Sequence, residues 1–177
     1  MVLTNSIALN DAADLLSQAV LQVVLDSPNP VDYVDMARKC AARLLKHYHD
    51  IEKALQADRI PDSLPMPLEC YEGRYFNTQG NFHIEIQRHP DHPNSPTLRL
   101  AFQGLQSQEY DLRHLRENTF EWSLTEDEAA RRGRYHEISV EFWKMCFVMS
   151  DDGVRVEGLV WSGEPDSEPQ RFRRCEG

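Results

Sequence analysis

Four side chains in the strand-rich part of the chain have the chemistry to act on a small molecule. They are two tyrosines, a histidine and a glutamate: Tyr75, Tyr110, His114 and Glu141. A neutral imidazole beside a carboxylate can move a proton, and a tyrosine hydroxyl can polarise a carbonyl group. We predict these four as the candidate catalytic residues, with Glu141 near Trp143 on the same strand face.

Aromatic residues alternate along the same segments and would surround these polar groups. The set predicted to face inward and bind a substrate is Tyr71, Phe82, Phe102, Phe120, Trp122, Trp143, Phe147 and Trp161. Two interpretations stay open. The rings form a packed core, which is the ordinary role of such residues, or they line a mostly apolar pocket with few polar groups.

The spacing of apolar residues predicts two kinds of element. Over residues 11–26 and 33–57 they recur at helical spacing, which predicts two amphipathic helices, the first capped by Asn10. Residues 1–6 read as a short strand. Residues 60–67 contain three prolines and predict an extended linker. We therefore expect a strand and two-helix appendage over residues 1–60 and a β-domain over residues 61–177.

After the linker the apolar period changes to two. Alternating segments separated by turn signals predict about eight antiparallel strands, and hence an up-and-down barrel or a strongly curled sheet. Residues 126–133 are charged and predict a loop with one helical turn. The fold class expected is mainly β (α+β), with two amphipathic helices at the N-terminus.

Charge and composition exclude several classes of function. The formal net charge is -10, so the average field repels nucleic acid and anionic lipid. No window is long and apolar enough for a transmembrane helix. The four cysteines form no Cys-x-x-Cys pair, and no basic residue precedes Arg38, so neither disulfides nor a targeting signal is indicated. We predict a cytoplasmic protein without metal or cofactor.

Several motifs resemble a known family. Tyr71-x-Gly73-x-Tyr75, residues 80–82, residues 110–114, and Asp152-Gly153 with residues 158–161 are similar to the lipocalin-like domain of fungal class C beta-lactamase-related serine hydrolases. Residues 2–6 and 10–14 resemble the last core strand and final helix of the catalytic domain in that family. The resemblance implies an eight-stranded lipocalin-like barrel.

The resemblance also implies what this chain lacks. In that family the serine nucleophile and its lysine lie upstream of the strand that opens this sequence, and the sequence contains no Ser-x-x-Lys motif. No catalytic residue is carried over, because the Tyr-x-Asn at residues 75–77 has no nucleophile to serve. Beta-lactamase-type acyl-enzyme chemistry is therefore not expected of this chain alone.

Two hypotheses of function remain, with an apolar small molecule as the ligand of the first. The first is a small-molecule-binding protein that acts as a non-hydrolytic isomerase or cyclase, including a pericyclic one, in fungal secondary metabolism. The second is a non-catalytic binding or assembly module, or a truncated remnant of a beta-lactamase-related hydrolase. A strand without neighbours and an amphipathic helix favour a homodimer.

Overall fold

The computed structural model describes residues 11–88, 97–133, 139–163 and 167–175. The chain forms two compact units, one of residues 1–52 with 124–137 and the other of residues 53–123 with 138–177. The strand predicted at residues 1–6 lies outside the described residues, and the domain boundary predicted at residue 60 stays a prediction. Each unit is described by itself below.

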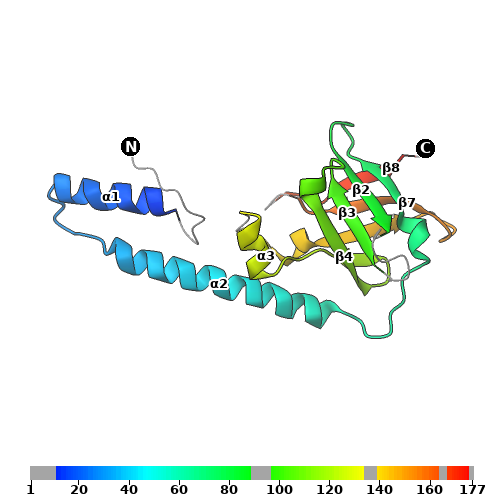
Figure 1. Cartoon of the computed structure of the whole chain (residues 1–177), viewed down its shortest axis with the longest axis horizontal. Helices are drawn as coiled ribbons and strands as arrows, with labels where there is room; N and C mark the ends of the chain where they lie inside the picture. Colours follow the sequence, from blue (N-terminus) through cyan, green and yellow to red (C-terminus); the bar gives the residue numbers. More distant parts are fainter. Residues whose placement is uncertain (1–10, 89–96, 134–138, 164–166, 176–177) are drawn as a thin grey trace. The chain divides into compact units, whose positions relative to one another are not determined.

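The first unit is helical. It contains α1 (Ala12–Val24), most of α2 (Tyr33–Asp58) and α3 (Glu126–Arg131), which are labelled in Figure 1. A prediction that is wrong is the cap of α1: Asp11, one residue later than Asn10, accepts the hydrogen bond of the Asp14 amide at 3.0 Å. The predicted single helical turn is α3, and the side chains of Thr125 and Glu128 close its first turn as a capping box.

A short turn joins α1 to α2, and one glutamine holds it in place. The side-chain amide of Gln22 donates to the carbonyl of Val31 at 3.0 Å and accepts from the amide of the same residue at 2.9 Å. The hydroxyl of Tyr33 donates to the side chain of Gln18 at 3.1 Å. These contacts satisfy backbone groups that the two prolines between the helices leave outside any helix.

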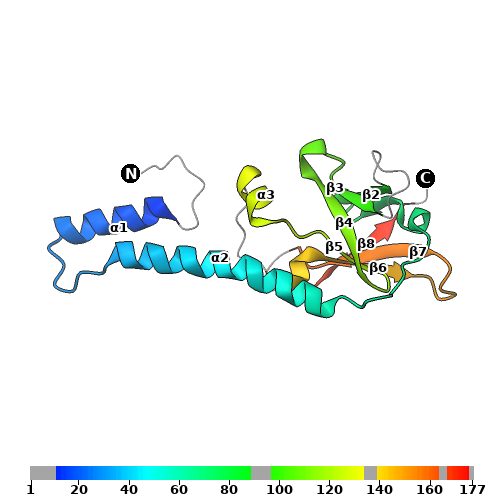
Figure 2. The same ribbon diagram turned by 60° about the horizontal axis from the view of Figure 1, so that its bottom comes forward.

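The second unit is a closed antiparallel barrel, which confirms the predicted fold class. Its eight strands follow one another around the barrel in chain order, and β8 closes on β1. The strands are β1 (Gly73–Phe76), β2 (His83–Arg88), β3 (Leu98–Phe102), β4 (Glu109–Arg116), β5 (Thr119–Glu121), β6 (Lys144–Met149), β7 (Val156–Trp161) and β8 (Gln170–Arg174). Figure 2 labels β2 to β8. The predicted period of two therefore places one face of each strand inside.

Aliphatic side chains fill the inner face of β2, β3 and β4. Those with an exposed fraction of at most 1% are Ile84, Ile86, Leu98, Leu100, Leu112 and Leu115. Burying each one stabilises the fold by about 1.5–3 kcal/mol relative to leaving it in water. The remaining inner positions are mostly aromatic and form the candidate site. Among the described residues, every helix is too short or too polar to span a bilayer.

Candidate functional site

Aromatic rings inside the barrel contact one another around Phe102. The ring centroid of Phe102 lies 4.9 Å from that of Trp161 and 5.2 Å from that of Trp122. Tyr110 and Phe82 complete the shell at 5.9 and 6.1 Å. These are the ordinary distances of packed aromatic pairs. The structure thus brings four of the eight predicted substrate-binding residues into one cluster, Phe82, Phe102, Trp122 and Trp161, in which the rings contact one another.

A second group of rings lies around Tyr71. Its ring centroid is 4.8 Å from that of Phe147 and 5.0 Å from that of Phe120, and Phe147 lies 5.7 Å from Tyr75. All four side chains are buried, with exposed fractions between 0% and 6%. The packed-core interpretation describes this end of the barrel, while a role in binding substrate stays a prediction.

Two of the three tryptophans, Trp122 and Trp161, have structural hydrogen bonds from their indole groups, whereas the buried indole N–H of Trp143 has no partner in the described part of the chain. The N–H groups of Trp122 and Trp161 donate to one acceptor, the carbonyl of Phe142, at 3.1 and 2.8 Å. Phe142 belongs to a short 3-10 helix, Val140–Trp143, which precedes β6. Trp143 is 2% exposed, and its ring lies 4.9 Å from that of Trp122. The shared carbonyl fixes the rings of Trp122 and Trp161, a contact that the alternation of apolar residues does not predict.

The hydroxyl of Tyr75, the first predicted catalytic group, holds the backbone. It donates to the carbonyl of Tyr71 at 2.6 Å, and the residue is fully buried. The hydroxyl of Tyr71 donates to the side chain of Asn118 at 2.6 Å and accepts from the amide of Met66 at 3.0 Å. Burial raises the pKa of both tyrosines. Both phenols are therefore neutral near pH 7.

Tyr110 points into the barrel, as predicted, whereas His114 lies at an irregularity of β4. The pairing of β4 with β5 shifts between His114 and Arg116, and Leu115 is fully buried next to them. The imidazole of His114 is half-buried, with Nε2 2.9 Å from the carbonyl oxygen of Glu117. His114 lies opposite Phe120, and their ring centroids are 5.3 Å apart, so the expected alternation of Tyr110, Leu112 and His114 holds up to His114 and breaks only after it.

The predicted placement of Glu141 on a strand face beside Trp143 is also wrong. Glu141 lies in the 3-10 helix before β6, and its side chain is 63% exposed. Its carboxylate pairs with the ammonium group of Lys144 at 3.0 Å, whereas Trp143 is buried. A 3-10 helix turns by a third of a circle per residue, so residues two apart do not share a face. The four predicted catalytic residues thus lie in three different environments.

A buried carboxylate that the sequence reading missed lies on β5. The side chain of Glu121 is 4% exposed and binds Arg113, Arg59 and Ser123. Burial alone would raise the pKa of Glu121, but the hydrogen bonds and charge of Arg113 and the bonds from Ser123 outweigh burial and lower it. The sequence feature that could have indicated this buried carboxylate is a glutamate placed between Phe120 and Trp122 in a predicted strand.

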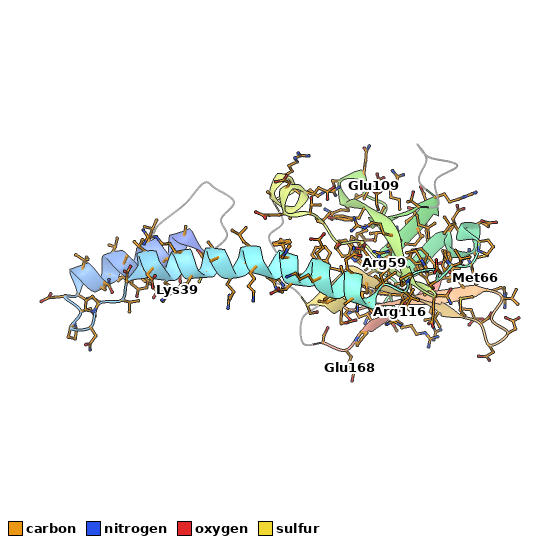
Figure 3. All side chains as sticks on the ribbon, turned by 90° about the horizontal axis from the view of Figure 1, so that it is seen from below. Lys39, Arg59, Met66, Glu109, Arg116 and Glu168 are labelled. Atoms are coloured by element: carbon orange, nitrogen blue, oxygen red, sulfur yellow. The ribbon has the colours of Figure 1, made fainter. Side chains whose placement is uncertain are left out.

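A second ion cluster lies where α2 ends. The side-chain hydrogen bond from Lys144, at 2.9 Å, is the main reason that the pKa of Asp58 is lowered. Arg116, which is labelled in Figure 3, pairs with the other oxygen of Asp58 at 3.0 Å. Because Lys144 also pairs with Glu141, two cations and two carboxylates balance one another in this cluster. Among residues 11–88, 97–133, 139–163 and 167–175, no cluster of His, Cys, Asp or Glu could hold a metal ion.

Comparison with known proteins identifies one family. The family described as "Domain of unknown function (DUF3471)" matches residues 57–174, which contain all eight strands. The search of curated proteins found no match. The barrel is also similar to a crystal structure of the C-terminal domain of a penicillin-binding protein, with 24% sequence identity and a TM-score of 0.42. That match covers 64% of this chain and 92% of the other.

Proposed function

We propose, from the premise that this chain belongs to the DUF3471 family, that it is a non-catalytic assembly module which pairs with a second copy through α1. In this proposal the barrel is the rigid domain of the module, and α1 makes the contact with the second copy. The observation that carries the proposal is the large apolar surface of α1, a helix in which no described residue is buried. A surface of this kind on a globular protein marks a contact with another molecule.

The exposed surface of residues 15–25, which comprise most of α1 and its C-cap Leu25, is rich in apolar side chains and uncharged. Val20, Leu21, Val23, Val24 and Leu25 have exposed fractions of 56%, 54%, 78%, 71% and 72%. Residues 15–25 contain no charged side chain, although the chain as a whole carries a formal charge of -10. Covering such side chains gains about 25 cal/mol per Å² of apolar area removed from water.

A second copy of the same helix suits this surface better than a charged partner does. Two copies of a chain with net charge -10 repel each other at most surfaces. Residues 15–25 are a stretch where that repulsion is weakest, because neither copy has a charge there. A two-fold axis would place the same apolar residues opposite one another, which is how most dimers form.

The barrel interior favours the module over an isomerase or cyclase of fungal secondary metabolism. A catalyst of that kind needs room for its substrate between the aromatic rings. Phe102 is instead within 6.1 Å, between ring centroids, of four other rings. The hydroxyl of Tyr75 and the carboxylate of Glu141 are engaged by Tyr71 and Lys144, respectively. The catalytic hypothesis therefore has the weaker support.

Sedimentation velocity at micromolar concentration tests the proposal. The wild-type chain is expected to sediment as a dimer, and the double variant Val20→Glu with Val24→Glu as a monomer with an unchanged circular dichroism spectrum. The matched control is Arg171→Gln with Arg173→Gln, which changes the net charge by the same amount on the exposed face of β8. A wild-type chain that sediments as a monomer would contradict the proposal. A wild-type chain that does not melt cooperatively would also contradict it, because that behaviour is expected of a truncated remnant.

A further inference from the structure

The outer surface of the barrel carries a groove rich in arginine. The groove has a volume of about 1090 Å³, and β1, β7, β8 and the residues beside them line it. Its arginines are Arg74, Arg155, Arg171, Arg173 and Arg174. The face belongs to the barrel unit alone and is separate from α1, so it does not depend on the proposed self-association.

The groove is positive on a protein that is otherwise strongly acidic. Its lining has five arginines against two glutamates, a formal charge of +3, whereas the whole chain carries -10. One of the two, Glu72, is already paired with Arg88, which lies outside the groove. The other, Glu157, lies 4.0 Å from Arg155, and both side chains are more than half exposed. Arg74 is paired with Glu85, outside the groove lining, at 3.4 Å, so the positive charge that is left for a ligand comes mainly from the arginines of β8.

Strand geometry sets the spacing of the outward arginines. Phe172 is fully buried, so Arg171 and Arg173 on either side of it point outward from β8. Side chains two apart on a strand are separated by about 6.6–6.8 Å. Arg173 pairs with Phe76 of β1, and Arg74 lies two residues before Phe76. Three guanidinium groups therefore start from one outer face across two neighbouring strands.

Two of these arginines have no partner in the described part of the chain. The structure gives Arg171 and Arg173 neither an ion pair nor a hydrogen bond there, and both are exposed. Arg174 differs, because its guanidinium donates to the backbone carbonyls of Cys70, Glu72 and Val156. Arg174 thus stabilises the end of the barrel and adds positive field, while Arg171 and Arg173 are available to a ligand.

We propose that this groove binds an acidic segment of a partner polypeptide in extended conformation, with carboxylates at alternate positions. Alternate side chains of an extended chain repeat at the same distance as Arg171 and Arg173, so each carboxylate meets one guanidinium. Such pairs are charge-assisted and can be bidentate. A short segment fits better than a polynucleotide, since a long polyanion would run beyond the groove onto the acidic remainder of the chain.

Fluorescence anisotropy with labelled peptides tests the inference on the full chain. The probe has glutamate and threonine in strict alternation. One comparison peptide has the same composition with its glutamates contiguous, and a second has glutamine in place of glutamate. The alternating peptide is expected to bind at least about tenfold more tightly than either, with an affinity that falls as salt rises. A single-stranded oligonucleotide of similar charge is the third ligand.

Variants assign the binding to the groove. Arg171→Gln with Arg173→Gln is expected to weaken the alternating peptide by about tenfold or more, and Arg171→Lys with Arg173→Lys by less, because lysine keeps the charge but not the bidentate geometry. The control is Arg38→Gln with Lys39→Gln, which removes the same charge from exposed positions of α2 (Lys39 in Figure 3).

Four results would overturn the inference: equal binding of the alternating and contiguous peptides, tighter binding of the oligonucleotide, no effect of the groove variants, or an equal effect of the control. Because the peptide assay does not involve α1, its failure leaves the sedimentation result as an independent test of the assembly module. The melting temperature of each variant confirms that loss of binding is not loss of fold.

Discussion

Arg113 and Glu121 face each other across β4 and β5 and join through two parallel hydrogen bonds. The Nε–Oε1 distance is 2.6 Å and the Nη2–Oε2 distance is 2.9 Å. Arg59, just after α2, adds a third bond to the same carboxylate at 3.1 Å. One buried carboxylate therefore ties two strands to the segment that enters the barrel, and its charge is needed in the folded state.

Replacing this carboxylate by an amide is expected to destabilise the fold. Glu121→Gln removes the charge that two arginines bind, and we expect a loss of about 2 kcal/mol in the free energy of unfolding, measured by urea denaturation. The loss stays below that of a fully buried pair because Arg113 is 45% exposed and regains water. The control Asp50→Asn removes the ion pair between Asp50 and Lys46, in which the side chain of Asp50 is 52% exposed. It should lower the free energy of unfolding by less than about 1 kcal/mol. Equal losses would contradict the account.

The same group predicts a loss of stability in acid. The pKa of Glu121 is lower in the folded chain than its usual value, so its contribution is full above the unfolded pKa of about 4.3 and is lost as the pH falls through the folded pKa. The pKa of Asp58 is also lowered in the folded chain, so its contribution to stability is lost in acid as well. The free energy of unfolding should therefore fall between about pH 5 and pH 3, and fall less in Glu121→Gln. Identical pH profiles for both proteins would exclude this role.

Removing the hydroxyl of Tyr75 separates a structural role from a catalytic one. Tyr75→Phe leaves the carbonyl of Tyr71 buried without its donor, and we expect a loss of about 1–3 kcal/mol in thermal or chemical denaturation. The comparison variant Tyr33→Phe loses an exposed bond to Gln18 and should change stability by about 0.5 kcal/mol or less. A Tyr75→Phe variant as stable as the wild type would show that the hydroxyl is not needed for the fold.

Truncating the central ring of the interior should be costly. Phe102→Ala removes a ring that contacts four others, and we expect a loss of about 3–5 kcal/mol in the free energy of unfolding. Leu105→Ala, at a position that is 53% exposed, is the matched control and should cost well below about 1 kcal/mol. If both variants unfold at the same urea concentration, the ring cluster is not a packed core.

The strands were predictable because a half-buried strand records its two faces in its own sequence. The period of two marked the first five strands, β1 to β5, and the helical period marked α1 and α2. Irregularities in how two strands pair leave no such pattern in the sequence of either strand. The shift of pairing at His114 exists only between β4 and β5, and it moves Leu115 inward.

The candidate site was less predictable than the fold for the same reason. Alternation correctly placed Tyr75 and Tyr110 inside, but Glu141 lies in a 3-10 helix whose period differs from that of a strand. The five hydrogen bonds of Glu121 come from three residues that lie 2 to 62 positions away, and only the folded chain brings all of them together. Whether rings fill a barrel or line a hollow depends on distances between strands, which alternation does not encode.

The account rests on a barrel interior filled by its own rings, so that function lies on the outer surfaces. Diffraction from crystals under xenon pressure tests this most directly, because xenon enters dry apolar cavities. We predict no xenon site among the rings around Phe102 in the wild type and a bound xenon atom there in Phe102→Ala. Xenon inside the wild-type barrel would contradict the account and would revive the hypothesis of an apolar ligand.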